Sequence, residues 1–246
     1  MTSLLPLDLE GHPQMTCAVG SLLMYLIDTQ KSAPEQIKEL TIRQRGSHMQ
    51  LDRSTLRNLE LLETIYDHDV KGSLLGVLGK TKTAMGGRLL RQWLREPLRD
   101  SSEINRRLDA VGELRSNAII ANNISNSLRS VYDFQRLTAA ISAGRANARD
   151  LIALKTTLAQ LPDIHEQLDY LEGTLSEGTL LREISEGISD FDDLHNMIDR
   201  SICEEPPHII TEGGLIKAGY SEELDELCNF GLMPPTADII PSISYL

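Results

Sequence analysis

Segments of helical length, with apolar residues three or four positions apart, recur along most of the chain and constrain its fold more than any other feature. The clearest of them follows Thr83 and gathers apolar residues on one half of a helical wheel, namely Leu89, Leu90, Trp93 and Leu94. Such spacing is typical of an amphipathic helix, and we expect Trp93 to be buried. Hydrophobic residues are 41% of the chain and aromatic residues only 4%, so the core must be mainly aliphatic. We predict an all-α fold.

Residues that cap helices stand ahead of several of these segments. The predicted N-caps are Asp52, Thr83, Asp100, Asp133 and Asn147. Their side-chain oxygens accept hydrogen bonds from the first free backbone N–H groups of a helix. Asp100 is followed three residues later by Glu103, which resembles a capping box. An earlier helix is expected from Pro13 to Thr29, with one apolar face to bury.

Glycine and proline predict where the helices end. Gly144 stands where a C-cap glycine belongs, and we expect Pro97 and Pro162 to end the helices before them. After Asp100, apolar residues recur at three- and four-residue steps at Ile104, Leu108, Val111 and Leu114, as on the apolar face of a helix.

Two short segments are not predicted to be helical. Gly46-Ser47 is turn-like, so residues 40–42 and 48–51 are candidates for a short hairpin. Residues 204–220 contain Pro206-Pro207 and Gly213-Gly214, which exclude a helix and predict a small extended excursion. A helix is expected to resume at Ser221.

The charge is unevenly distributed. The net charge is -12, and residues 151–246 hold 4 Lys and Arg against 19 Asp and Glu. A compact nucleic-acid binder usually has a basic footprint, which the chain as a whole lacks. The acidic half is a solvated face or a surface for a partner.

A local excess of positive charge lies between residues 80 and 115. Its members are Lys80, Lys82, Arg88, Arg91, Arg95, Arg99, Arg106, Arg107 and Arg115. These side chains suit contacts with phosphates or ion pairs between helices and domains, and we favour ion pairs because no aromatic residue is interleaved for base stacking.

No motif predicts a catalytic, cofactor-binding or metal-binding residue. Gly79-Lys80-Thr81 ends like a P-loop, but Leu74 stands where that motif requires glycine. The six histidines include no HExxH, and Asp190, Asp192 and Asp193 lack the glycine and glutamate of a calcium loop. The three cysteines are far apart, and no signal peptide or membrane segment is evident, so we expect a cytoplasmic protein.

Ordered motifs resemble the MutS family of DNA mismatch-repair ATPases, and specifically its helical core or lever domain. Residues 49–61 (MQLDRSTLRNLEL) resemble the family's "LD, two residues, T, then RNLEL" signature, and residues 81–100 resemble its "TxTxMGxRLLxxWLxxPLxD" block. Further matches follow in the same order at residues 72–75, 104–114, 144–151, 205–207, 213–214, 219–220 and 223–227. The ordered set is far more specific than any single motif.

The resemblance implies a non-catalytic domain, residues 1–228, followed by a divergent tail, residues 229–246. The family's Walker A motif and mismatch-sensing Phe-x-Glu motif are both absent here. ATP and Mg would therefore belong to other parts of a full-length protein, which would bind mismatched DNA. The expected partners are those remaining domains, with DNA bound only through the full-length protein. We expect the chain itself to be a monomer or weak dimer without enzyme activity.

Two alternatives come from other functional classes. One is a helical protein-interaction scaffold with no role in DNA repair. The other is a phosphate-binding enzyme that uses Lys80 and Thr81.

Overall fold

The described part of the chain is mostly helical, which confirms the predicted all-α fold. The computed structural model describes residues 13–30, 46, 48–172, 179–189, 191–207 and 213–229. The chain divides into two compact units, Met1–Arg45 and Gly46–Leu246. Within the described residues, extended backbone pairing is limited to two isolated bridges. None of the described helices is long and apolar enough to cross a membrane.

The described part of the first unit is α1 (Pro13–Gln30). Its bounds confirm the helix predicted from the apolar stripe of this segment. Leu22, Met24 and Tyr25 are exposed, and the rest of this unit, against which the predicted apolar face would pack, lies outside the described residues.

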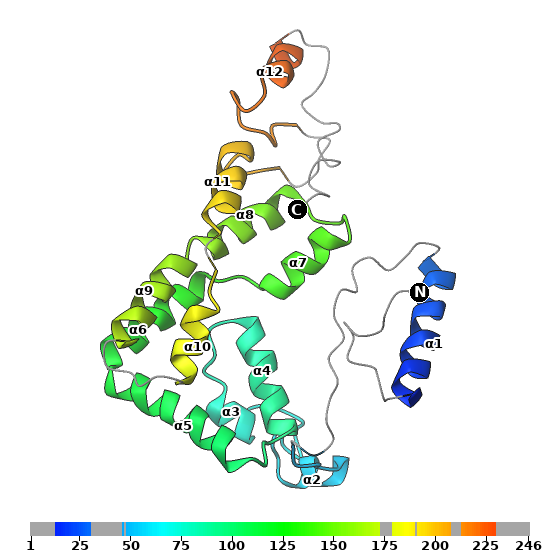
Figure 1. Cartoon of the computed structure of the whole chain (residues 1–246), viewed down its shortest axis with the longest axis vertical. Helices are drawn as coiled ribbons and strands as arrows, with labels where there is room; N and C mark the ends of the chain where they lie inside the picture. The colour runs from blue at the N-terminus through cyan, green and yellow to red at the C-terminus, as the bar shows by residue number, and fades with distance from the viewer. Residues whose placement is uncertain are drawn as a thin grey trace. The chain divides into compact units, whose positions relative to one another are not determined.

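The second unit holds the remaining helices (Figure 1). They are α2 (Arg53–Asn58), α3 (Leu74–Leu78), α4 (Ala84–Arg95), α5 (Ser101–Ser116), α6 (Ala118–Ser127), the 3-10 helix η2 (Leu128–Ser130), α7 (Phe134–Ser142), α8 (Ala148–Leu158), α9 (Leu161–Glu172), α10 (Leu180–Glu186), α11 (Asp192–Ser201) and α12 (Glu222–Asn229).

All five predicted N-caps are present. Asp52 Oδ1 accepts from Thr55 N at 2.6 Å, and Thr83 Oγ1 accepts from Gly86 N at 3.0 Å. The other three, Asp100, Asp133 and Asn147, cap α5, α7 and α8. The capping box is found at Asn147, where Asp150 returns the bond. At Asp100 the carboxylate accepts from Ser102 N at 2.9 Å.

The predicted helix ends are confirmed at Pro97 and Gly144 and wrong at Pro162. α4 ends at Arg95, and Gly144 has a left-handed φ of 63° directly after α7. α8 ends at Leu158, and Pro162 instead lies in the first turn of α9. Proline fits a first turn because an N–H there has no partner inside the helix.

An isolated bridge lies at each of the two segments predicted to be extended. His48 pairs with Leu98. Next to this bridge, the carbonyl oxygen of Pro97 accepts a hydrogen bond from Met49 N at 2.7 Å. The predicted hairpin between residues 40–42 and 48–51 cannot be followed further, because residues 40–42 lie outside the described residues. The bridge between Ile202 and Ile216 confirms the excursion near 204–220.

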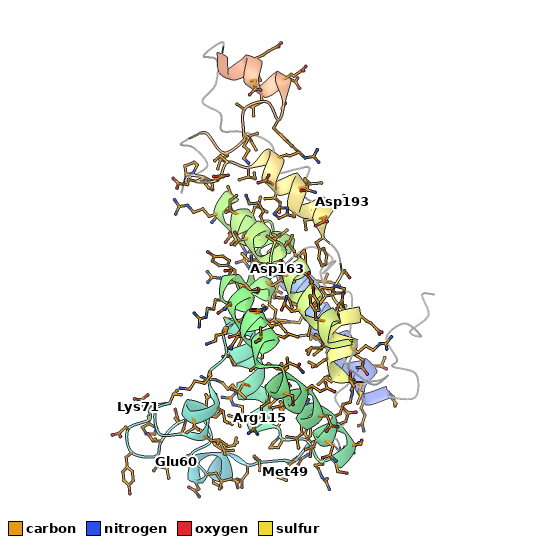
Figure 2. The ribbon with its side chains drawn as sticks, turned by 90° about the vertical axis from the view of Figure 1, so that its left-hand side faces the viewer. Met49, Glu60, Lys71, Arg115, Asp163 and Asp193 are labelled. Carbon is orange, nitrogen blue, oxygen red and sulfur yellow. The ribbon has the colours of Figure 1, made fainter. Side chains whose placement is uncertain are left out.

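Two core clusters hold the second unit together (Figures 1 and 2). The first cluster, from α5, α9 and α10, comprises Ala110, Ile164, Leu168, Leu171 and Leu181. The second cluster, from α7, α8, α11 and the residue after it, comprises Leu137, Leu154, Leu158, Ile198 and Ile202. Both are mainly aliphatic, as the composition predicts. Because α8 and α9 are separated by only two residues, the clusters are joined by nearly continuous helix.

The prediction that Trp93 is buried is wrong, and much of the apolar face predicted for α5 is exposed as well. Trp93 is 40% exposed, and α4 has no buried residue. On α5, Leu108 and Val111 are 60% and 61% exposed, while Ala110 enters the first cluster. Apolar spacing identifies a face of a helix, but it does not show whether another element covers that face.

Candidate functional site

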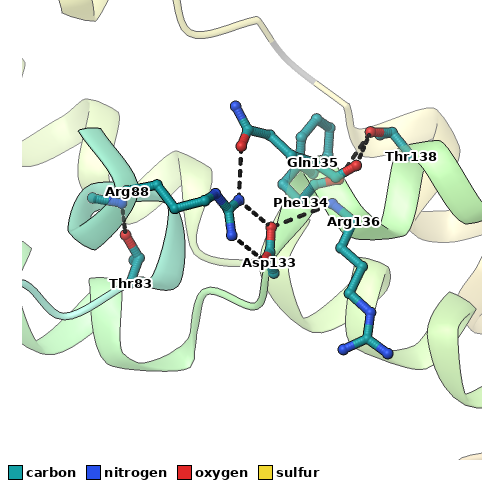
Figure 3. A network of polar contacts seen from close by, with 8 residues as sticks. Thr83, Arg88, Asp133, Phe134, Gln135, Arg136 and Thr138 are labelled. Atoms are coloured by element: carbon teal, nitrogen blue, oxygen red, sulfur yellow. Dashed lines mark hydrogen bonds and ion pairs between the residues drawn. The ribbon is translucent and has the colours of Figure 1, made fainter. Parts of the chain in front are cut away.

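The start of α7 and the exposed face of α4 meet in the polar network shown in Figure 3. Thr83 caps α4 and so fixes the turn from which Arg88 projects. Arg88 Nη1 donates to Asp133 Oδ2 at 2.7 Å, and Nη2 donates to Asp133 Oδ1 at 2.8 Å. Nη2 also donates to Gln135 Oε1 at 2.7 Å. We call Arg88, Asp133 and Gln135 the α4–α7 clasp.

Asp133 has two tasks in the clasp. Its Oδ1 accepts the backbone N–H of Arg136 at 3.2 Å, which caps α7, and both of its oxygens accept from Arg88. A bidentate pair fixes orientation as well as distance. The pair therefore links α4 to the first turn of α7, whose Leu137 lies in the second core cluster.

The clasp shifts the pKa values of both charged partners. The hydrogen bonds from Arg88 lower the pKa of Asp133 to about 2, from an ordinary value of 3.8. The backbone bond from Arg136 acts in the same direction. The bond to Asp133 raises the pKa of Arg88. The carboxylate is thus held in its charged form.

Replacing Arg88 with alanine is expected to raise the pKa of Asp133 toward 3.8. A carboxylate whose pKa is lower in the folded state stabilises the fold above pH 3.8, and this contribution is lost as the pH falls through about 2. The variant should therefore lose less stability than the parent between pH 4 and pH 2. NMR titration of the Asp133 carboxyl measures the shift. Arg91→Ala is the control, and an equal shift in that variant would contradict the assignment.

Further polar contacts tie α5 to its neighbours. Arg106 forms an ion pair with Glu183 of α10. The Nη1 atom of Arg106 also lies 3.5 Å from Glu103 Oε2 on the same helix, α5. The Arg107 guanidinium lies 3.9 Å above the centre of the Trp93 ring, which connects α5 to α4. The predicted inter-helix pairs are therefore confirmed for Arg88 and Arg106.

We expect Trp93→Ala to cost about 1–2 kcal/mol of unfolding free energy. The ring is only partly buried, and the cation–π contact with Arg107 adds about 0.5–1 kcal/mol at an exposed site. Urea unfolding followed by circular dichroism measures the change. A loss of 3–5 kcal/mol, as for a fully buried tryptophan, would contradict the observed exposure.

The sequence missed a second polar junction. Lys155 Nζ of α8 lies 2.9 Å from Asp199 Oδ1 of α11, and Lys217 Nζ lies 3.6 Å from the same oxygen. The bond from Lys155 lowers the pKa of Asp199. The Ile202–Ile216 bridge brings Lys217 to this place, so spacing along the chain gives no signal of the junction.

The residues of the P-loop-like sequence are not arranged to hold a phosphate. Gly79 N donates to Leu75 O and Lys80 N to Leu78 O, both at 2.7 Å. These N–H groups are therefore engaged with the end of α3, whereas a P-loop directs them at the phosphates. Within the described ranges, no three His, Cys, Asp or Glu side chains are grouped to hold a metal.

Comparison with protein families matches residues 54–232 to MutS domain III. This chain belongs to the MutS family. The sequence-based resemblance is therefore confirmed. The DNA mismatch repair protein MutS of Halothermothrix orenii is 44% identical over 218 residues, and that of Desulforamulus reducens is 42% identical over 220. Each alignment covers 89% of this chain, and the chain spans about a quarter of the length of these MutS relatives.

Proposed function

We propose that this chain is the non-catalytic mechanical core of a MutS-family mismatch-repair protein. In that role it couples a part that hydrolyses ATP to a part that grips DNA. The match to MutS domain III, and relatives that are named as DNA mismatch repair proteins, support a place for this chain in a mismatch-repair protein. Mismatched DNA, ATP and Mg would then be bound by other parts of the full-length protein, in the cytoplasm, and the chain alone would hold no cofactor and catalyse no reaction.

The α4–α7 clasp is the observation that carries the proposal. α4 has no buried residue, so the bidentate Arg88–Asp133 pair is its principal polar link to α7. Coupling between sites needs rigid elements that can adopt discrete arrangements. A polar clasp between a lightly packed helix and a packed pair of helices has that character, because it can re-form in a new register without opening a core.

A chimera tests the coupling. Residues 54–229 of this chain would replace the matching segment of the Halothermothrix orenii protein, and mismatch-duplex affinity would be measured with and without ATP. We expect ATP to change the affinity by at least about fivefold, a usual size for allosteric coupling. Arg88→Ala should reduce that ratio while ATP binding stays unchanged. If the Arg88→Ala chimera showed the same ratio of affinities with and without ATP as the unsubstituted chimera, the proposed coupling role of the clasp would be contradicted.

The chimera and the isolated chain together separate the two alternatives. A chimera that folds but restores no ATP-dependent change in DNA affinity would favour an interaction scaffold. Micromolar ATP binding by the isolated chain, lost in Lys80→Ala, would favour the phosphate-binding enzyme. The hydrogen bonds that engage the Gly79 and Lys80 backbone argue against that second outcome.

A further inference from the structure

One side of α5 carries an exposed apolar stripe. Ile104, Leu108 and Val111 are 37%, 60% and 61% exposed. At about 100° per residue, these three side chains fall within about 60° of one another. Leu108 lies about 160° around the helix from Ala110, which enters the first core cluster. Because α5 runs along an outer edge of the second unit (Figure 1), the stripe faces away from the core of that unit.

Charges of opposite sign stand at the two ends of this stripe. Arg115, in the last turn of α5, is exposed and forms no ion pair or hydrogen bond with another described residue. At the other end, Asp100 Oδ1 accepts from Ser102 N and Ser102 Oγ, both at 2.9 Å. These bonds lower the pKa of Asp100, so its carboxylate is charged at neutral pH. Its Oδ2 has no hydrogen-bond partner among the described residues.

The spacing of these residues makes the stripe complementary to itself. Leu108 stands almost midway, with Arg115 about 10.5 Å along the helix on one side and Asp100 about 12 Å on the other, at 1.5 Å per residue. If Leu108 faces Leu108 of an antiparallel copy, Arg115 therefore comes level with Asp100 of that copy to within about 1.5 Å. A parallel pair would instead place like charges together at both ends. Asp100 also lies within about 20° of Val111 around the helix, so it borders the same face.

We propose that α5 of a second copy docks on this stripe, in an antiparallel two-fold dimer that forms the Arg115–Asp100 pair twice. A two-fold interface brings the same patch of both copies together, which is what a self-complementary pattern requires. Gly112 borders the stripe, and no described atom lies within 4 Å of a Cβ built there, so a second helix can approach closely on that side.

The net charge of -12 is concentrated away from this contact. The acidic excess lies in residues 151–246, whereas α5 carries as many arginines as acidic residues. Repulsion between exposed charges of the two copies is screened beyond about 8 Å at physiological salt. The affinity therefore depends mainly on the residues at the contact.

We expect a weak dimer. A single helix pair buries less surface than the roughly 1,200–2,000 Å² of a stable interface, so the dissociation constant should be on the order of 100 µM. Sedimentation equilibrium of the full chain, from about 10 to 800 µM, measures it. Leu108→Glu should leave the chain monomeric, because it places two like charges opposite one another in an apolar contact. Since Leu108 is largely exposed, this variant should fold, and circular dichroism checks its helix content.

A double-mutant cycle tests the antiparallel register. Arg115→Glu should weaken the dimer at least about tenfold, because it faces Asp100 of the second copy at both ends. Asp100→Asn removes that charge and keeps the N-cap, since asparagine caps a helix as well as aspartate does. In the Asp100→Asn background, Arg115→Glu should therefore change the dissociation constant by less than about threefold. Arg129→Glu is the matched control, with the same change of charge at an exposed arginine on η2, and it should leave the dimer unchanged.

Three results would overturn the proposal. A chain that stays monomeric to 800 µM would leave the stripe to another part of a longer MutS-type chain. A dimer that persists in Leu108→Glu would have its contact elsewhere on the surface. Equal effects of Arg115→Glu with and without Asp100→Asn would show that these two residues do not meet, and the antiparallel arrangement would be wrong.

Discussion

Replacing Leu158 with alanine is expected to destabilise the second unit by about 3–5 kcal/mol, the largest loss among the substitutions considered. Leu158 is 3% exposed in the second core cluster, where it packs with Leu137 and Leu154. Truncation of a buried leucine loses the transfer free energy of the side chain and leaves a cavity that neighbouring helices fill only in part. Against a total stability of about 5–15 kcal/mol, much of the protein would unfold at physiological temperature. Urea unfolding followed by circular dichroism measures the loss.

Leu108→Ala is the matched control for this prediction. The same side chain is removed, but Leu108 is 60% exposed on α5, so we expect a change within about 0.5 kcal/mol. Equal losses at both positions would show that the α5 stripe is covered in solution and that the assignment of the two clusters is wrong.

The comparison of these two leucines shows what the sequence could and could not predict. Three- and four-residue spacing predicts the helix that carries Leu108, and the predicted cap at Asn147 begins the helix that carries Leu158. Every predicted N-cap is correct, because a cap depends on atoms within a few residues. Burial depends on which other helix arrives at a face. Leu158 packs in one cluster with residues of α7 and α11. Leu108 is 60% exposed, and no helix among the described residues of the second unit covers it.

The candidate site shows the same division between local and distant information. Asp133 could be predicted as a cap from the residues that follow it, and Arg88 could be placed on the polar side of its helix. Their pairing joins positions 45 residues apart. The spacing of residues along the chain cannot predict a contact over such a separation, so the clasp could be identified only from the structure. The ordered family motifs predicted the type of domain because together they extend over most of the chain and are specific to one family fold.

Gly76→Ala is expected to disrupt the junction between α3 and the loop before it. A Cβ added to Gly76 would lie 2.2 Å from the carbonyl oxygen of Val70, so backbone must move. That oxygen accepts from Ser73 N at 3.1 Å and from Ser73 Oγ at 2.7 Å, and Ser73 is buried. Relief of the clash therefore breaks hydrogen bonds in a buried turn, and we expect a local cost of about 2–4 kcal/mol.

Amide hydrogen exchange at Leu74 and Leu75 measures this cost locally, because their N–H groups donate to Glu60 O and Leu61 O at 3.0 and 2.9 Å. At tenfold per 1.4 kcal/mol, exchange should accelerate by about 30- to 700-fold. Gly112→Ala is the control, since nothing lies within 4 Å of a Cβ there and alanine favours a helix interior by about 0.5–1 kcal/mol. It should stabilise α5. Unchanged exchange in Gly76→Ala would mean that the Val70 carbonyl moves aside freely, and that the turn does not hold α3 in place.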